Sequence, residues 1–174
     1  MPKRVSNVSS AIRNVECVWA LICSLSVIDR DTNNISLFNV VEQMGVAAGF
    51  FQSEEFKKNG FAVLQMEWEL VLMLRRLIPT DIDPSAVTVD VKLSMIDPQG
   101  KAIQEVLTPV TFPANARRYR FVFKMKGLPI GLPGDYVYRV ELRQPGESEF
   151  STVREIPFDV LKIEAMLPSV TAGL

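Results

Sequence analysis

The sequence contains no histidine, and only two of its 174 residues are cysteine. Histidine is the commonest general acid or base in enzymes and the commonest metal ligand, so its absence argues against most metal-dependent and histidine-dependent chemistry. Cys17 and Cys23 are six residues apart in a segment that reads as one strand. A straight strand separates them by roughly 20 Å, too far for a disulfide bond or a shared zinc ion. We therefore predict two buried, reduced thiols, no cofactor and a cytoplasmic location.

Excess charge and long apolar runs are also missing. The net charge is −1, so no overall field favours nucleic acid. The longest apolar-rich run, residues 17–28, is shorter than the ~20 residues of a membrane-spanning helix. The first fifteen residues contain no apolar stretch of the signal-peptide kind. We expect a basic tail over residues 1–15, one domain over 16–163 and a second tail over 164–174, with neither nucleic acid nor membrane as a partner.

Alternation of apolar and polar residues dominates the rest of the chain. It has a period of two, turn-forming residues separate the alternating runs, and no long segment has a helical period. Residues 16–28 are apolar on both faces and predict a central strand or one that bridges two sheets. With the turn at 29–34 and residues 35–41, this strand continues into a hairpin. The pattern predicts an all-β protein, a two-layer β-sandwich of about eight strands that is immunoglobulin-like or C2-like. Both tryptophans, Trp19 and Trp68, are expected in its core.

The connection from residue 46 to residue 61 is unusually aromatic. Ser53 is placed to cap a short helical turn that ends near Gly60. Four phenylalanines lie in this crossover, and they either plug an open end of the sandwich or form a patch that meets a partner. We predict that the crossover is an interaction surface for a protein partner or for a second copy in a homodimer. Its candidate residues are Phe50, Phe51, Phe56 and Phe61.

The segment from Asp29 to Asn34 partly resembles a calcium-binding loop. Asp29, Asp31 and Asn33 occupy positions one, three and five of the pattern, but position six is not glycine and position twelve, Val40, is not glutamate. A looser calcium site, of the kind found in C2-type domains, is the alternative to a simple hairpin turn. We expect the turn, which accounts for the same residues without a metal.

Two charged groupings on predicted strands have functional and structural interpretations. Glu67 and Glu69 share a strand face at a spacing that could suit a glycosidase, although alternating acids are also what a solvated face requires. The segment Arg117–Lys126 carries the best positive patch of the chain, whose aromatic residues point to the other face, unlike a nucleic-acid-binding strand. We expect both faces to be solvated, the cations pairing with acids of a neighbouring strand. The patch comprises Arg117, Arg118, Arg120, Lys124 and Lys126.

Several blocks of sequence resemble a family of small bacterial β-sandwich proteins of unknown function. The first block contains the motif ALIC at residues 20–23 and a SLFNV strand at residues 36–40, joined by a polar turn. The blocks 133–140 and 156–160 resemble the closing strands of the same family. The resemblance implies a compact all-β sandwich in a bacterial cytoplasm, with no assigned activity and no functional residues.

Together these observations favour a non-enzymatic β-sandwich module that binds a protein partner or itself. The alternative is a sandwich that binds a small molecule or a carbohydrate through the aromatic crossover. A hydrolase that uses carboxylates is a more distant alternative, because no residue is singled out for catalysis.

Overall fold

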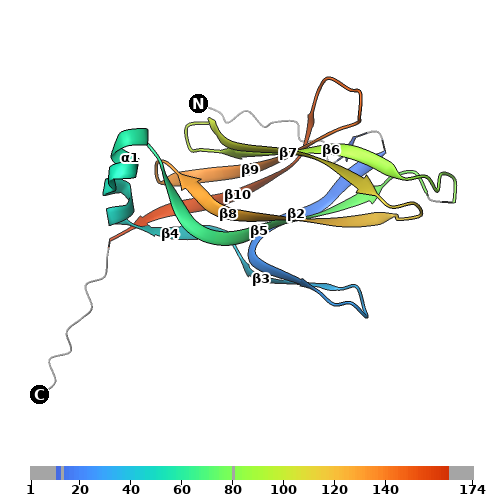
Figure 1. Cartoon of the computed structure of the whole chain (residues 1–174), viewed down its shortest axis with the longest axis horizontal. Helices are drawn as coiled ribbons and strands as arrows, with labels where there is room; N and C mark the ends of the chain where they lie inside the picture. Colours follow the sequence, from blue (N-terminus) through green and yellow to red (C-terminus); the bar gives the residue numbers. More distant parts are fainter. Residues whose placement is uncertain (1–10, 13, 80, 165–174) are drawn as a thin grey trace, which may run out of the picture.

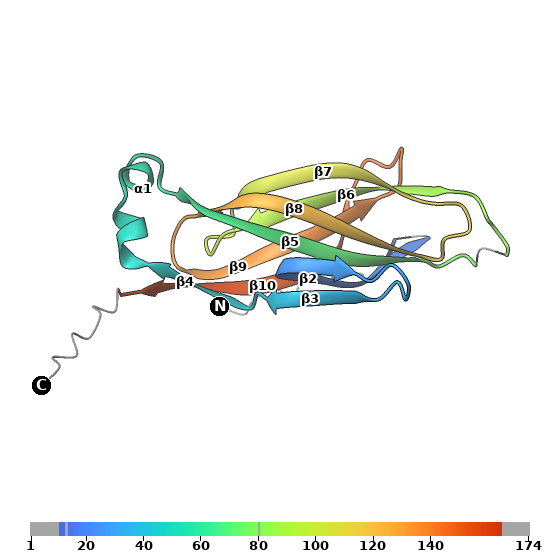
Figure 2. The ribbon, with the colours of Figure 1, turned by 60° about the horizontal axis from the view of Figure 1, so that its bottom comes forward.

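The computed structural model describes residues 11–164 except residues 13 and 80. Two sheets pack face to face, with a short helical segment at one end (Figures 1 and 2). The predicted all-β, two-layer sandwich is confirmed. The strands are β1 (Ala11–Ile12), β2 (Val15–Ile28), β3 (Ile35–Val40), β4 (Gln43–Ala47), β5 (Ala62–Arg76), β6 (Val87–Ile96), β7 (Ala102–Phe112), β8 (Arg118–Ile130), β9 (Gly134–Arg143) and β10 (Ser151–Ile163).

The two sheets exchange strands along the chain. Sheet A has the order β1-β2-β5-β8, with β3 paired to β2, and sheet B has the order β4-β10-β9-β6-β7. Neighbouring strands are antiparallel except for β4 and β10, which run parallel. About eight strands were expected, and the described residues form nine strands of five or more residues together with the two-residue β1.

The core lies between the sheets and is built from the alternating apolar positions. The fully buried side chains come mainly from β5, β6 and β9, whose sequences alternate most cleanly. Trp68 is 2% exposed, as predicted, and its ring lies 5.0 Å from the ring of Tyr138 across the interface between the sheets.

Trp19 is outside this core, so its predicted placement is wrong. A β-bulge at Val18 shifts the register of β2 against β5, so that Cys17 pairs with Leu74 and Trp19 with Met73. The extra residue reverses the side-chain alternation, because neighbouring residues of a strand point to opposite faces. Cys17 and Ala20 therefore point into the core, while Trp19 is half-buried and belongs to the outer face of sheet A.

Strand β2 bends back on itself beyond the bulge. Its first half pairs with β5, its second half pairs with β3, and the β2–β3 hairpin returns along the outer face of sheet A (Figures 1 and 2). Glu69 of β5 holds the bend, since its Oε2 accepts hydrogen bonds from the Ser26 backbone at 2.7 Å and from the Ser26 hydroxyl. Asn39 adopts a left-handed conformation with φ of 49° opposite the bend. The predicted hairpin is confirmed, and its fold-back is a feature that strand periodicity does not reveal.

The crossover between β4 and β5 contains the helical turns. A 3-10 helix, η1 (Ala48–Gln52), precedes a helix, α1 (Glu54–Asn59). The Ser53 hydroxyl accepts a hydrogen bond from the Phe56 backbone at 3.2 Å, and Gly60 ends α1 with a φ of 76°, as predicted. Among the described residues, neither helix is long and apolar enough to cross a lipid bilayer.

Candidate functional site

The outward face of the β2–β3 hairpin is apolar and accessible. Leu25 and Phe38 are direct cross-strand partners, and Val27 lies on the same face one pleat further along β2. Their exposed fractions are 48%, 49% and 48%. Among the described residues, β3 pairs with β2 on one side only, and none of the six residues of β3 is charged. The hairpin therefore combines an open strand edge with exposed apolar side chains.

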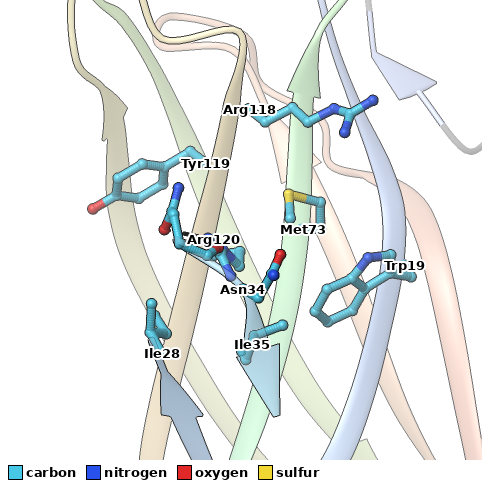
Figure 3. A pocket seen from close by; sticks show the side chains of 9 residues that line it. Trp19, Ile28, Asn34, Ile35, Met73, Arg118, Tyr119 and Arg120 are labelled. Carbon is cyan, nitrogen blue, oxygen red and sulfur yellow. Dashed lines mark hydrogen bonds between the residues drawn. The ribbon is translucent and has the colours of Figure 1, made fainter. Parts of the chain in front are cut away.

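The inward face of the hairpin covers a cavity of about 640 Å³, which we call the hairpin pocket. Figure 3 shows Trp19, Met73 and Arg118 on three neighbouring strands of sheet A, with Asn34 and Ile35 of the hairpin to the left of Trp19 and below Arg118 in this view. The sheet contributes Trp19, Met73, Arg118, Tyr119 and Arg120 to the lining. The hairpin contributes Ile28, Asn33, Asn34 and Ile35.

The charge at the hairpin pocket is positive. The Arg120 guanidinium donates from Nη2 to both the backbone oxygen and the side-chain oxygen of Asn33, which ties the hairpin tip to β8. Arg118 is exposed, and it makes no hydrogen bond or ion pair with the residues that the structure describes. No carboxylate is part of the lining.

The predicted basic face of β8 divides into two parts. Lys124 and Lys126 pair with Glu69 and Glu67 of β5 at 3.5 Å and 3.6 Å, as expected for cations beside a strand that carries acids. Only the arginine end of the face reaches the hairpin pocket. The predicted solvated face is wrong for Glu69, because the hairpin covers it and leaves its side chain 6% exposed, against 79% for Glu67.

Both apolar and polar groups line the hairpin pocket. The indole of Trp19 and the thioether of Met73 are cross-strand partners on the outer face of sheet A. Tyr119 turns its ring away toward Phe112, at 5.8 Å between ring centroids. The chemical character of the pocket therefore comes from one indole, one thioether, two isoleucine side chains, two guanidinium groups and the asparagine side chains of the hairpin.

The four phenylalanines of the crossover lie at the other end of the molecule from the hairpin tip (Figures 1 and 2). Phe51 packs edge-on against Phe50 and Phe56, with ring centroids at 5.5 Å and 5.6 Å, and Phe50 and Phe51 also contact the core. Phe61 is 43% exposed. Much of this aromatic surface is therefore in contact with other parts of the same fold. A binding role for the crossover stays a prediction.

The loop at Asp29 has the geometry of a turn. The Oδ1 atom of Asp29 accepts hydrogen bonds from the backbone N–H groups of Asp31 at 2.8 Å and of Thr32 at 3.0 Å. The hydrogen bonds from Thr32 and Asp31 lower the pKa of this exposed carboxyl. Asn33 has a φ of 54°, the left-handed conformation expected of an asparagine in such a turn. Within residues 11–164, apart from 13 and 80, no group of three or more acidic, cysteine or histidine side chains could hold a metal.

Both thiols are free and buried, as predicted. Burial raises the pKa of Cys17 to about 11, against smaller opposing effects of Arg154. Burial and the neighbouring Glu69 carboxylate raise the pKa of Cys23, which lies outside the main core. Neither thiol therefore has the lowered pKa of a reactive cysteine.

Sequence reasoning identified Arg118 and Arg120 but not the pocket to which they belong. The missing information was the bulge at Val18, which presents Trp19 on the outer face, and the bend of β2, which brings Asn33 back over β8. Neither feature changes the apolar character of residues 16–28, so strand periodicity contains no signal for the pocket.

No protein-family model and no curated protein matches the sequence. Among solved structures, the chain is similar to part of a family 123 glycoside hydrolase from Clostridium perfringens, described in terms of glycolipid glycan hydrolysis. The two chains are 14% identical with a TM-score of 0.38, and the match covers 83% of this chain and 27% of that one. The chain thus spans about a quarter of the length of that protein, and a similarity at this level assigns neither a family nor an activity.

Proposed function

We propose that the protein is a non-enzymatic, cytoplasmic interaction module that forms a homodimer by pairing β3 with β3 of a second copy. The observation that carries the proposal is the uncharged edge of β3 beside three half-exposed apolar side chains. Exposed strand edges normally carry charges, prolines or bulges that prevent pairing with another chain. An edge without these devices is suited to accept a further strand.

Comparison with the other sheet edges supports this choice. Strand β8 carries arginines and lysines along its length, and β7 carries Glu105 and Pro109. Strand β4 is uncharged, but it exposes none of its large apolar side chains. Of the four edge strands with five or more residues in the part of the chain that the structure describes, β3 alone combines absence of charge with an apolar exposed face.

A second copy is the occupant that fits this edge. Antiparallel pairing of β3 with β3 of a second copy is symmetric about a two-fold axis, so both copies use the same surface. No like charges meet, because β3 carries no charged residue. Pairing centred on Phe38 places the two Phe38 rings opposite each other on the same face, and such cross-strand aromatic pairs are stabilising. Six residues per strand bury less than the ~1,200–2,000 Å² of a stable interface. We therefore expect a dimer whose population depends on concentration.

The carboxylates support a non-enzymatic function over a hydrolase. Glu69 is engaged by Ser26 and Lys124, and Glu67 by Lys126, so both acids take part in contacts that hold sheet A and its hairpin together. A glycosidase pair needs two carboxyl groups that face a shared substrate site. The hairpin pocket has no carboxylate in its lining.

Light scattering with size-exclusion chromatography over a range of protein concentrations tests the proposal. We expect a mass that rises toward twice the 19.5 kDa of one chain. Phe38→Lys places a charge on the proposed axis and should keep the protein monomeric. Leu107→Lys is the matched control, because it makes the same kind of change at an exposed position of edge strand β7 and should leave the dimer intact.

The proposal is wrong if the unmodified protein stays monomeric at the highest concentration. It is also wrong if the Phe38→Lys protein dimerises like the Leu107→Lys protein. Thermal melts of both variants show whether each remains folded.

A further inference from the structure

The hairpin pocket has the size and the composition of a ligand site. Its volume of about 640 Å³ lies within the ~300–1,000 Å³ that is usual for small-molecule pockets. Such pockets combine apolar walls with a few polar groups that fix the orientation of the ligand. Here Trp19, Met73, Ile28 and Ile35 provide the apolar surface, and the guanidinium groups provide the polar one.

The arginines determine which charge the hairpin pocket favours in a ligand. Arg120 is held by two hydrogen bonds to Asn33, and this contact fixes its position at the mouth of the hairpin. Arg118 follows two residues along β8 and has no partner among the described residues. The next cation on this face, Arg75 of β5, is paired with Glu16. A guanidinium that has no hydrogen bond or ion pair with the described residues, beside a lining without acids, favours an oxyanion, which its planar donors can bind through two hydrogen bonds.

The side chains of Trp19 and Met73 determine which shape of ligand the hairpin pocket favours. In Figure 3, Arg118 lies at one end of the pocket, above Met73 and Trp19. The indole is half-buried and outside the core, although burial within the sandwich would stabilise the fold more. A β-bulge, a feature common beside binding sites, presents it there. A flat apolar group is the body that fits against an indole and a thioether.

Because Arg118, Trp19 and Met73 line the same pocket, we infer that the hairpin pocket binds an organic anion. This anion has a flat apolar body and one oxyanion group, either a carboxylate, a sulfonate or a phosphate. Arg118 contacts the oxyanion, and Trp19 and Met73 contact the apolar body. The inference is independent of the proposed dimer, because the pocket is on the inward face of the hairpin and the pairing surface is on its edge.

Titration with 8-anilinonaphthalene-1-sulfonate tests the inference, because this fluorescent probe joins a flat aromatic body to one sulfonate. We expect saturable binding of one probe per chain, with energy transfer from tryptophan to the probe that Trp19→Phe reduces, Trp68 remaining as the second donor. N-phenyl-1-naphthylamine, which lacks the sulfonate, should bind about tenfold more weakly or worse. Added salt should weaken binding of the anionic probe.

Arg118→Gln should weaken probe binding by about tenfold, because it removes the charged donor without breaking a hydrogen bond or ion pair among the described residues. Arg117→Gln is the matched control, since this neighbouring arginine is exposed and outside the pocket lining, and it should leave affinity within about twofold. Binding that is not saturable overturns the inference. Equal affinities of the two variants, or of the two probes, also overturn it. Light scattering on the same samples reports separately on the dimer.

Discussion

Glu67 and Glu69 are two positions apart on the same face of β5, yet their surroundings differ completely. The side chain of Glu67 stands in solvent beside Lys126, whereas that of Glu69 lies under the hairpin. Its Oε2 receives two hydrogen bonds from Ser26, one from the backbone and one from the hydroxyl. A buried carboxylate is costly without such partners, so Glu69 and the bend of β2 stabilise one another.

We predict that Glu69→Ala reduces the free energy of unfolding by about 1–3 kcal/mol, because the Ser26 backbone and hydroxyl lose their acceptor beneath the hairpin. The hairpin should also loosen, so Cys23, which lies beside Glu69, should react faster with a thiol reagent. Urea denaturation and the rate of thiol modification measure the two effects. Glu67→Ala is the control and should change neither by much. Equal effects of the two variants would contradict this role of Glu69.

The residue scale is where the sequence is least informative. Trp68 could be placed in the core because the apolar positions from Met66 to Leu74 alternate regularly, beyond the irregularity between Leu64 and Glu67. Trp19 could not be placed, since one extra residue at Val18 moves it to the other face. Glu69 could not be placed either, because its burial depends on a hairpin more than forty residues earlier in the chain.

At the scale of elements, the connection between β5 and β6 depends on Arg76. This side chain is buried, and its guanidinium donates to the backbone oxygens of Ser85 and Asp83, both at 2.7 Å. It also lies 3.6 Å from the Asp83 carboxylate. The last residue of a sheet A strand thereby holds the loop that leads into sheet B.

Arg76→Leu should reduce the free energy of unfolding by about 3 kcal/mol, because two loop carbonyls lose a charged donor that is buried. Arg75→Leu is the control at the neighbouring position, where the arginine pairs with Glu16 nearer the surface, and should cost less than about 1 kcal/mol. Chemical denaturation of both variants makes the comparison. If the Arg75 variant were the less stable one, this assignment of the loop anchor would fail.

Elements with their own local signals were predictable, and elements that depend on remote partners were not. Ser53 and Gly60 mark the ends of α1 by their chemistry, and both were recognised. Strand β4 has only five residues, including Gly45, and within the described part of the chain it pairs only with β10, more than a hundred residues later. The hairpin was recognised from its turn residues, but its pocket depends on how β2 bends over sheet A.

At the scale of the whole molecule, the two outer faces differ. The outer face of sheet B carries cross-strand ion pairs, with Lys92 and Glu141 at 2.7 Å and Arg143 and Asp90 also at 2.7 Å. The ring of Phe150 lies over Lys92 and Arg143. The outer face of sheet A instead carries the hairpin and its pocket. The outer face of sheet B carries solvated charges, whereas the outer face of sheet A carries an apolar hairpin. Both proposed interactions therefore involve sheet A.

The absence of histidine also has a consequence for the whole molecule, since few side chains titrate between about pH 5 and 8. Burial instead raises the pKa values of Cys17, Cys23, Tyr136 and Tyr138. Above about pH 9, the ordinary thiol value, an unfolded chain releases protons that the folded protein retains. The free energy of unfolding therefore falls as the pH rises.

We predict a melting temperature that is nearly constant from about pH 6 to 8 and falls between about pH 9 and 11. Cys17→Ala should show a smaller fall, because one of the buried protons is no longer present. Circular dichroism melts across this range measure both. The steepest change lying between pH 6 and 8 would contradict the prediction, and so would an unchanged alkaline fall in the variant.

The position of β10 has a consequence for biosynthesis. This strand lies between β4 and β9, yet the ribosome makes it after every other strand of the described chain. Strand β4 is synthesised early, and more than a hundred further residues are translated before its partner β10 is complete. Sheet B can therefore close only when synthesis of the described segment is nearly complete. Until then, the open edges of β4 and β9 are the surfaces on which a nascent chain is most open to misassociation or to chaperone binding.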